Sequence, residues 1–324
     1  MLVDKYNRSF PYLRLSITEV CNFSCNYCLP DGYKKTGAEH FLNQDEIRRL
    51  VDAFVELGVW KIRLTGGEPT IRKDFTEIAK MIGDRPEIDT LAFTTNGYRL
   101  KERAQEWHDA GLNAINVSID SLNAKKFHAI TGHDRMQEVR EGIDKAIEVG
   151  FKDVKINVVL LKGVNDDELD NYLEYVKDTP VSVRYIELMQ TGDNLTYFNK
   201  FHLSSDTVKD KLLAQGWVEN IRALGAGPAA NFTHADYAGS IGLIAPYSKD
   251  FCTNCNRLRI TSSGDLRLCL FGNVGIPLRH MLHNDDQKGD LVAAISKQLD
   301  YKASSHFLAL GDTGIMTNLS STGG

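Results

Sequence analysis

The chain has 324 residues, a formal charge of −5 and a hydrophobic content of 42 %, enough for a substantial core in one large domain or two ordinary ones. This slightly acidic balance argues against a general nucleic-acid surface, although a local group of arginines could still bind a small anionic substrate. No apolar run approaches the length of a membrane span and the first ten residues contain no apolar signal region, so we expect a cytoplasmic protein that binds neither membrane nor nucleic acid.

Six short β-like stretches alternate with segments of helical periodicity. The expected strands are Tyr12–Ile17, Lys61–Thr65, Leu91–Thr95, Ala114–Ile119, Val154–Leu160 and Val181–Glu187. The expected helices are Gln44–Leu57, with Asn43 as its cap, Lys73–Ile82, Lys101–Ala110, Met136–Val149 and Asp166–Lys177. This order predicts an α/β fold with parallel strands and right-handed crossovers. A partial, TIM-like (β/α)6 barrel fits the order, and so does a doubly wound open sheet.

One face of the expected strands is polar and cationic. Arg14 and Ser16 alternate with apolar residues in the first strand, Lys61 and Arg63 do so in the second, and Lys155 does so in the fifth. Parallel strands covered on both sides are usually apolar throughout. The pattern therefore favours an open lumen that holds a polar ligand, and the alternative is an uncovered sheet whose polar face meets solvent.

Three cysteines follow the first strand with C-x3-C-x2-C spacing: Cys21, Cys25 and Cys28. Three thiolates can hold three irons of a cubane cluster and leave the fourth iron open to a small molecule. A structural zinc site would require a fourth ligand, and the nearest candidate is His40, across a loop. The spacing therefore favours an iron–sulfur cluster with an open coordination position.

A second triplet with C-x2-C-x13-C spacing consists of Cys252, Cys255 and Cys269. The spacing alone also fits zinc, with His280 or His283 as the fourth ligand. Two compact triplets, far apart in the chain, favour metal ligation in a reducing compartment over disulfide bonds.

The first triplet, with Tyr27 before its last cysteine and Gly66-Gly67-Glu68-Pro69 after the next strand, resembles the radical S-adenosylmethionine (SAM) superfamily. The resemblance implies a [4Fe-4S] cluster whose open iron binds SAM, and a 5'-deoxyadenosyl radical that abstracts hydrogen from substrate. The cofactor-binding residues that it implies are Tyr27, Gly67, Ser118 and Met189.

A second set of motifs lies in the C-terminal third: Gly227-Pro228-Ala229, Gly242-Leu243-Ile244, the run from Phe251 to Arg259 and the final Gly323-Gly324. With these motifs the chain resembles one family of that superfamily, the GTP 3',8-cyclases (molybdenum cofactor biosynthesis protein A), from Leu13 to about Phe271 and again in the tail. This resemblance implies two [4Fe-4S] clusters, held by the two cysteine triplets, and the cyclisation of GTP to 3',8-cyclo-7,8-dihydro-GTP after hydrogen abstraction from ribose C3'.

The same resemblance implies roles for particular residues and parts of the chain. Catalysis would involve Cys21, Cys25, Cys28, Arg257 and Arg259, and the GTP site would contain Arg14, Arg63, Thr94, Lys155, Arg257, Leu258 and Arg259. Residues 1–220 would form the radical SAM partial barrel, and residues 221–324 the auxiliary-cluster domain with its Gly-Gly tail.

Three partners are implied as well: GTP as substrate, cyclic pyranopterin monophosphate synthase as the next enzyme, and a reductase or flavodoxin as electron donor. A homodimer is the oligomer we consider. Two alternatives remain open at this point. One is a radical SAM peptide-modifying maturase with an auxiliary cluster, and the other is an electron-transfer or zinc-scaffold protein on a βα frame.

Overall fold

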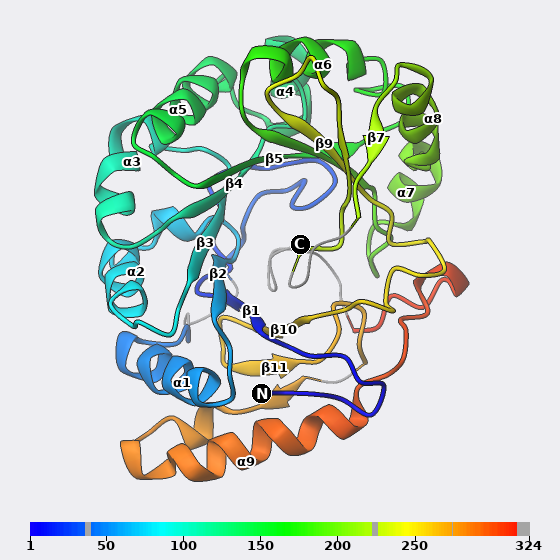
Figure 1. Ribbon diagram of the computed structural model, residues 1–324. Coiled ribbons are helices and arrows are strands. Elements are labelled where there is room, and N and C mark those ends of the chain that lie inside the picture. The colour runs from blue at the N-terminus through cyan, green and yellow to red at the C-terminus, as the bar shows by residue number, and fades with distance from the viewer. Residues whose placement is uncertain (36–39, 222–225, 274, 316–324) are drawn as a thin grey trace.

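The computed structural model describes residues 1–35, 40–221, 226–273 and 275–315, and one sheet organises this part of the chain (Figure 1). The strand order in the sheet is β12-β11-β10-β1-β2-β3-β4-β5-β6-β9-β8-β7. The strands are β1 (Tyr12–Ser16), β2 (Lys61–Thr65), β3 (Thr90–Thr95), β4 (Ala114–Ser118), β5 (Asp153–Leu160), β6 (Ser182–Glu187), β7 (Val218–Glu219), β8 (Ala230–Thr233), β9 (Ser240–Ile244), β10 (Arg257–Ile260), β11 (Asp265–Arg267) and β12 (Ile276–Pro277).

Neighbouring strands from β10 through β1–β6 to β9 are parallel. Figure 1 shows this sheet curving around a central space, with α1–α6 on its outer side. The barrel is not closed, because the order ends in β12 on one side and β7 on the other. The predicted partial (β/α)6 barrel is therefore confirmed, and the doubly wound sheet is excluded.

The helices include all five that the periodicity predicts, each within three residues of its expected ends. They are α1 (Gln44–Glu56), α2 (Phe75–Gly83), α3 (Leu100–Asp109), α4 (Ala124–Thr131), α5 (Met136–Glu148), α6 (Leu169–Asp178), α7 (Leu195–Phe201), α8 (Asp206–Ala214) and α9 (Lys288–Gln298), with 3-10 turns at Pro69–Ile71, Arg279–Met281, Asp285–Gln287, Leu299–Tyr301 and Leu308–Leu310. Asn43 caps α1 as expected, since its side chain accepts from the Glu46 amide while the Glu46 carboxylate accepts from the Asn43 amide. None of the described helices combines the length and apolar composition that a bilayer span requires.

The C-terminal part of the chain extends the sheet at both edges. β9 pairs with β6, where Ser240 lies opposite Ser182, and β10 pairs with β1, where Arg257 lies opposite Tyr12. Neither strand is predicted from the sequence pattern. As a consequence, side chains far apart in the chain become neighbours on the inner face of the barrel.

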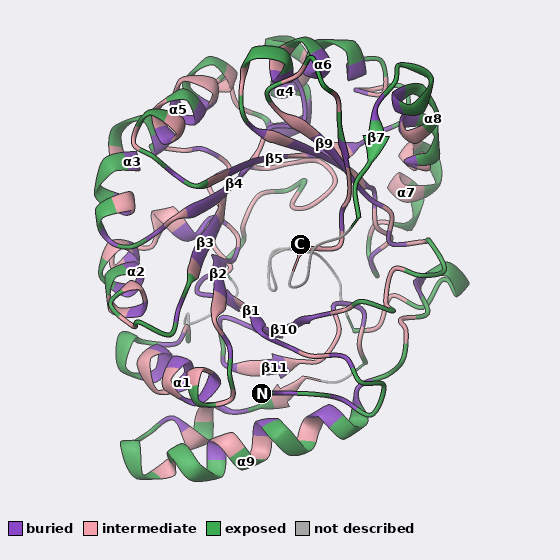
Figure 2. Cartoon of the chain, viewed as in Figure 1, coloured by how far each residue is buried: buried purple, intermediate pink, exposed green. Residues whose placement is uncertain are grey.

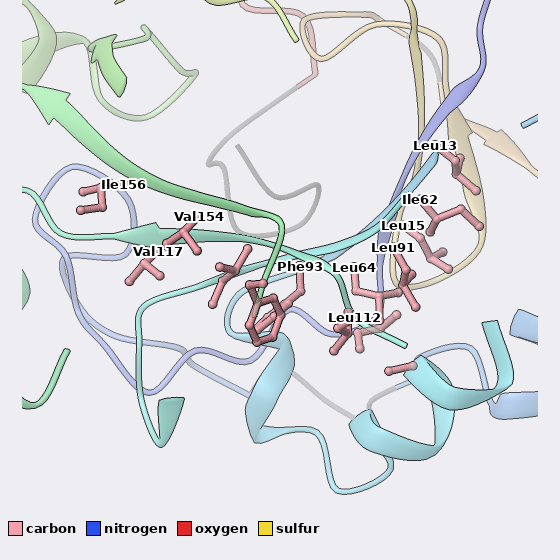
Figure 3. Close-up of a cluster of buried hydrophobic side chains, with 14 of the residues drawn as sticks. Leu13, Leu15, Ile62, Leu64, Leu91, Phe93, Leu112, Val117, Val154 and Ile156 are labelled. Carbon is pink, nitrogen blue, oxygen red and sulfur yellow. The ribbon is translucent and has the colours of Figure 1, made fainter. Parts of the chain in front are cut away.

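The main hydrophobic core lies between the sheet and its outer helices. Figure 2 shows the buried residues on the sheet and on the inward sides of the helices, while the outward sides are exposed. Figure 3 shows apolar side chains of neighbouring strands gathered in this core, among them Leu13, Ile62 and Phe93, which are all 0 % exposed. Because successive strand residues point to opposite faces, burying these residues turns their polar neighbours into the barrel.

Candidate active site

A cavity of about 220 Å³ lies on the inner face of the sheet. Seven cations from five strands line it: Arg14, Lys61, Arg63, Lys155, Arg184, Arg257 and Arg259. Asp153 is the one carboxylate among the described residues of its wall. Arg63 and Arg184 are only 7 % and 8 % exposed, so the polar face borders a lumen and is not an uncovered sheet surface.

On the inner face, the pairing of β10, β1 and β2 sets six side chains in two rows. Arg14 of β1 lies between Arg63 of β2 and Arg259 of β10, all three in register. One layer below, Tyr12 lies between Lys61 and Arg257. Neighbouring strands are about 4.8 Å apart, so the cationic groups are crowded together.

The crowding has electrostatic consequences. Burial and the cations Arg184, Arg63 and Lys61 lower the pKa of Lys155 to about 6, even though the Asp153 carboxylate contacts its ammonium group. Burial, with Arg63 as the leading cation, lowers the pKa of Arg184 to about 9. Each added positive charge is thus unfavourable here unless an anion is present.

Several buried polar atoms at the cavity lack a partner among the described residues. They include Nε of Arg63, Arg184 and Arg259 and the side-chain oxygens of Asn116 and Asn157. Buried donors are normally hydrogen-bonded. A polyanionic ligand with several oxygen atoms would satisfy the guanidinium groups and neutralise their charge.

Five of the seven predicted substrate residues line this cavity: Arg14, Arg63, Lys155, Arg257 and Arg259. Thr94 does not line it. Leu258 is 1 % exposed and packs in the main core, because it alternates with the two arginines of β10. Leu258 could therefore contact the substrate only through its backbone atoms.

The first cysteine triplet lies in the loop after β1, at the carboxyl end of the barrel strands. The loop is tied to the end of α4, because the amides of Ser24 and Asn26 donate to the carbonyls of Thr131 and Ile130. It turns tightly over the cysteines themselves, where the Cys28 amide donates to the Cys25 carbonyl at 3.0 Å. All three cysteines lie outside disulfide bonds and are partly exposed.

Two buried carboxylates hold the surroundings of this triplet together. Glu68 accepts hydrogen bonds from Thr70, from the Thr95 hydroxyl and from the Asn96 amide, which joins the loops after β2 and β3. Asp120 accepts from the Tyr27 hydroxyl at 2.8 Å and from the Val159 amide at 2.7 Å. Burial raises the pKa of Asp120 to about 6.

Burial and the Glu68 carboxylate raise the pKa of the Cys21 thiol to about 11. A thiolate at this position therefore requires a cationic partner, which the irons of a cluster would supply.

The second triplet lies in the wall of the cationic cavity, which Cys252, Cys255 and Cys269 all line. Burial raises the pKa of the Cys252 thiol, but hydrogen bonds from His306 and Ser305 outweigh burial and lower the pKa to about 7. The two triplets thus have opposite surroundings, acidic at the first and cationic at the second.

Among the described residues, no three His, Cys, Asp or Glu side chains are arranged as ligands of a single ion. The cysteines of a cubane do not converge on one ion, because each binds a different iron.

Of the predicted cofactor residues, Tyr27, Gly67 and Ser118 lie at the carboxyl ends of the barrel strands but outside the cavity wall. Met189 follows β6, lines the cavity and, like Cys269, packs against the apolar cluster of Leu270, Phe271 and Leu308. Met189 therefore lies both at the carboxyl end of the barrel strands and in the wall of the cationic cavity. The predicted Gly323-Gly324 tail lies outside the described residues.

Comparisons with known proteins agree with this geometry. Residues 15–176 match the radical SAM superfamily, and residues 181–308 match the family described as Molybdenum Cofactor Synthesis C. GTP 3',8-cyclase of Stenotrophomonas maltophilia (strain R551-3) is 55 % identical over 323 residues, covering 100 % of this chain and 99 % of the relative. GTP 3',8-cyclase of Yersinia pestis is 53 % identical with the same coverage.

The chain belongs to the GTP 3',8-cyclase family. A solved structure, Streptococcus suis SuiB bound to S-adenosylmethionine, has a TM-score of 0.58 and covers 89 % of this cyclase-family chain and 69 % of its own. Its sequence identity is 15 %, so this likeness concerns the fold alone. The full-length identity to the cyclases decides against the peptide-modifying alternative.

The residues of this GTP 3',8-cyclase family member fit the groups that the family implies. The six cysteines lie outside disulfide bonds and form two triplets, which suits clusters with one open iron each. The unpartnered guanidinium atoms suit an anionic substrate beside the second triplet.

Two glycines hold the loop before the first cysteine close to the end of β2. The Gly67 amide donates to the Thr18 carbonyl at 3.0 Å. A Cβ atom on Gly67 would lie 2.3 Å from the Val20 carbonyl oxygen, and one on Gly66 would lie 2.2 Å from that of Thr18, where φ is +152°. Only glycine permits such a close backbone approach.

We expect Gly67→Ala to displace residues 18–20 and, through them, the cysteine loop. Iron content after anaerobic reconstitution and the affinity for SAM should both fall, the latter by about tenfold or more. Gly163→Ala is the control, because no atom lies within 4 Å of the added Cβ. Its φ of +70° is unfavourable for alanine, so the control also measures the effect of backbone strain alone. Normal iron and SAM binding in Gly67→Ala would contradict the prediction.

The cavity wall also contains residues that the sequence pattern does not predict. Tyr12, Asp153, Asn231 and His306 line the cavity, yet none belongs to a recognisable motif. For Tyr12 a signal exists, because it shares the inner face of its strand with Arg14. His306 comes from a segment without regular structure, and nothing local predicts its approach to Cys252.

Proposed function

We propose that this protein cyclises GTP to 3',8-cyclo-7,8-dihydro-GTP, the first step of molybdenum cofactor biosynthesis. The proposal depends on one observation: seven cations and the second cysteine triplet line the same cavity. A nucleoside triphosphate combines a polyanion with a base that can bind an open iron. A site that served only electron transfer would not require the arginine cluster.

Each part of the site has a proposed task. Cys21, Cys25 and Cys28 hold the cluster that binds SAM, with Tyr27, Gly67, Ser118 and Met189 around the cofactor. When bound, these groups would supply the 5'-deoxyadenosyl radical that removal of the C3' hydrogen of the ribose requires. Cys252, Cys255 and Cys269 would hold the second cluster, whose open iron could bind the base.

The cations of the cavity bind and orient the triphosphate. Arg14, Arg63, Lys155, Arg257 and Arg259 supply charge-assisted hydrogen bonds, and the planar guanidinium group suits paired phosphate oxygens. Arg257 and Arg259 also lie on the strand that follows the second triplet, so they would fix the nucleotide relative to its cluster. Thr94 and the Leu258 backbone complete the proposed set.

The wider setting is proposed on the same basis. Residues 1–220 act as the radical-generating part, and residues 221–324 supply the second cluster and the Gly-Gly tail. Cyclic pyranopterin monophosphate synthase would consume the product, a reductase or flavodoxin would donate the electron, and the working oligomer would be a homodimer in the cytoplasm.

One anaerobic assay tests the function. Reconstituted protein is incubated with GTP, SAM and a reductant, and the products are identified by mass spectrometry. We expect 5'-deoxyadenosine and a cyclised nucleotide with the mass of GTP, in equal amounts. Formation of 5'-deoxyadenosine without cyclised nucleotide would count against GTP as the substrate.

The affinity for GTP should depend on the charge of Lys155. In the free protein this ammonium has a pKa of about 6, and a bound polyanion raises it. Binding between the two pKa values takes up a proton, so affinity should fall as the pH rises above about 6, by up to tenfold per pH unit. Lys155→Arg keeps its charge over this range and should make the dependence less steep, as measured by calorimetric titration between pH 6 and 8. A wild-type profile no steeper than that of the variant would refute this account of Lys155.

A further inference from the structure

Tyr12 stands at the centre of the cationic wall, in a position otherwise given to cations. Its neighbours in register are Lys61 on β2 and Arg257 on β10. In the adjacent row, Arg63, Arg14 and Arg259 are all charged. Tyr12 is therefore the one side chain at these six positions that is not a cation, and it is 2 % exposed.

The Tyr12 side chain contacts four of the surrounding cations. Its ring centroid lies 5.4 Å from Lys61 Nζ, 5.6 Å from Arg63 Cζ and 6.0 Å from Arg257 Cζ. At these distances the ring face attracts a cation. The Tyr12 hydroxyl accepts a long hydrogen bond, 3.4 Å, from Arg14 Nε. One side chain thus constrains cations from three strands.

The hydroxyl also responds to the charge around it. Burial raises the pKa of the Tyr12 phenol, but Arg63, Arg14 and Arg257 outweigh burial and lower the pKa to about 7. Lys61 of β2 and Arg184 of β6 face the same group. A bound triphosphate would supply the negative charge itself, and the phenol would then regain its proton.

We propose that Tyr12 is a positioning residue of the triphosphate site, whose ring orients Lys61, Arg63 and Arg257 and whose hydroxyl takes up a proton when nucleotide binds. The inference rests on the proposed function, because it takes the triphosphate as the ligand. It assigns Tyr12 a part in substrate binding that acts through the cations.

The experiment compares reconstituted wild-type protein with Tyr12→Leu, Tyr12→Phe and the control Tyr185→Phe. Tyr185 is equally buried, and its hydroxyl has no hydrogen-bond partner among the described residues. GTP and tripolyphosphate are titrated calorimetrically at pH 7.5 in two buffers of different ionisation enthalpy, which yields affinity and proton uptake. SAM affinity and thermal unfolding report on the rest of the fold.

We expect Tyr12→Leu to weaken both ligands about 10- to 100-fold, since three ring–cation contacts are lost. Tyr12→Phe keeps the ring, so its affinity should stay within about threefold of wild type, while its proton uptake at pH 7.5 should fall by up to one proton. Tyr185→Phe should match wild type in both quantities.

Wild-type affinity in Tyr12→Leu, or wild-type proton uptake in Tyr12→Phe, would overturn the proposal. If Tyr12→Leu fails to fold, the proton count of Tyr12→Phe still decides. Failure of the proposed function is a separate result, since the wild-type protein would then form no cyclised nucleotide in the assay whatever the Tyr12 variants bind.

Discussion

The Cys269→Ser variant should still cleave SAM to 5'-deoxyadenosine, while its GTP cyclisation falls below detection. Cys269 lies in the wall of the cationic cavity with Cys252 and Cys255. The first triplet lies in a different loop, after β1, and shares none of these residues. Removing one of three ligands should empty the second cluster and leave the first in place.

The measurement combines iron content with product analysis. Iron should fall from about eight to about four atoms per chain, and SAM cleavage should continue at a rate within about tenfold of wild type. Thr253→Ala is the matched control, because Thr253 lies between two cysteines of the same triplet and is exposed. Cyclisation at the wild-type rate in Cys269→Ser would disprove the division of labour between the two clusters.

Cys21→Ser should abolish both SAM cleavage and cyclisation. Serine is a poor iron ligand. The Glu68 carboxylate near Cys21 does not offer a substitute, because it already accepts hydrogen bonds from Thr70, Thr95 and Asn96. The expected loss of product is at least about a thousandfold, because the radical precursor is no longer formed.

The control for Cys21→Ser is Ser24→Ala in the same loop, which removes only a long hydroxyl contact to the Thr131 carbonyl. GTP affinity is the second readout. It should stay close to wild type in Cys21→Ser, because the cationic cavity and the second triplet are intact. Residual SAM cleavage above the reagent background would show that the first triplet does not hold the SAM cluster.

The barrel strands and most of their helices are predictable from local pattern. The strand Lys61–Thr65 has the predicted bounds, and α1 begins at Gln44 after the expected cap. Short-range periodicity carries this information, because a side chain's face depends only on its immediate neighbours along the chain. Missed elements, such as α4 (Ala124–Thr131), are short or lie between stronger signals.

The six cysteines and five of the seven predicted substrate residues are likewise recognisable from spacing and motif, and the structure brings those five to one cavity. Leu258 shows the limit of a motif. It belongs to the run Arg257-Leu258-Arg259, yet alternation in β10 sends its side chain into the core. A motif identifies a segment, whereas the strand decides which of its side chains face the ligand.

The sequence alone determined the parallel βα order, the two incomplete ligand sets and the cationic face of the strands. Only the tertiary structure decided that β10 pairs with β1, which sets Arg257 and Arg259 beside Tyr12 and Arg14 and brings the second triplet to the same cavity. The physical reason is range: alternation and spacing act over a few residues, while pairing between distant strands depends on how the whole sheet curves and closes.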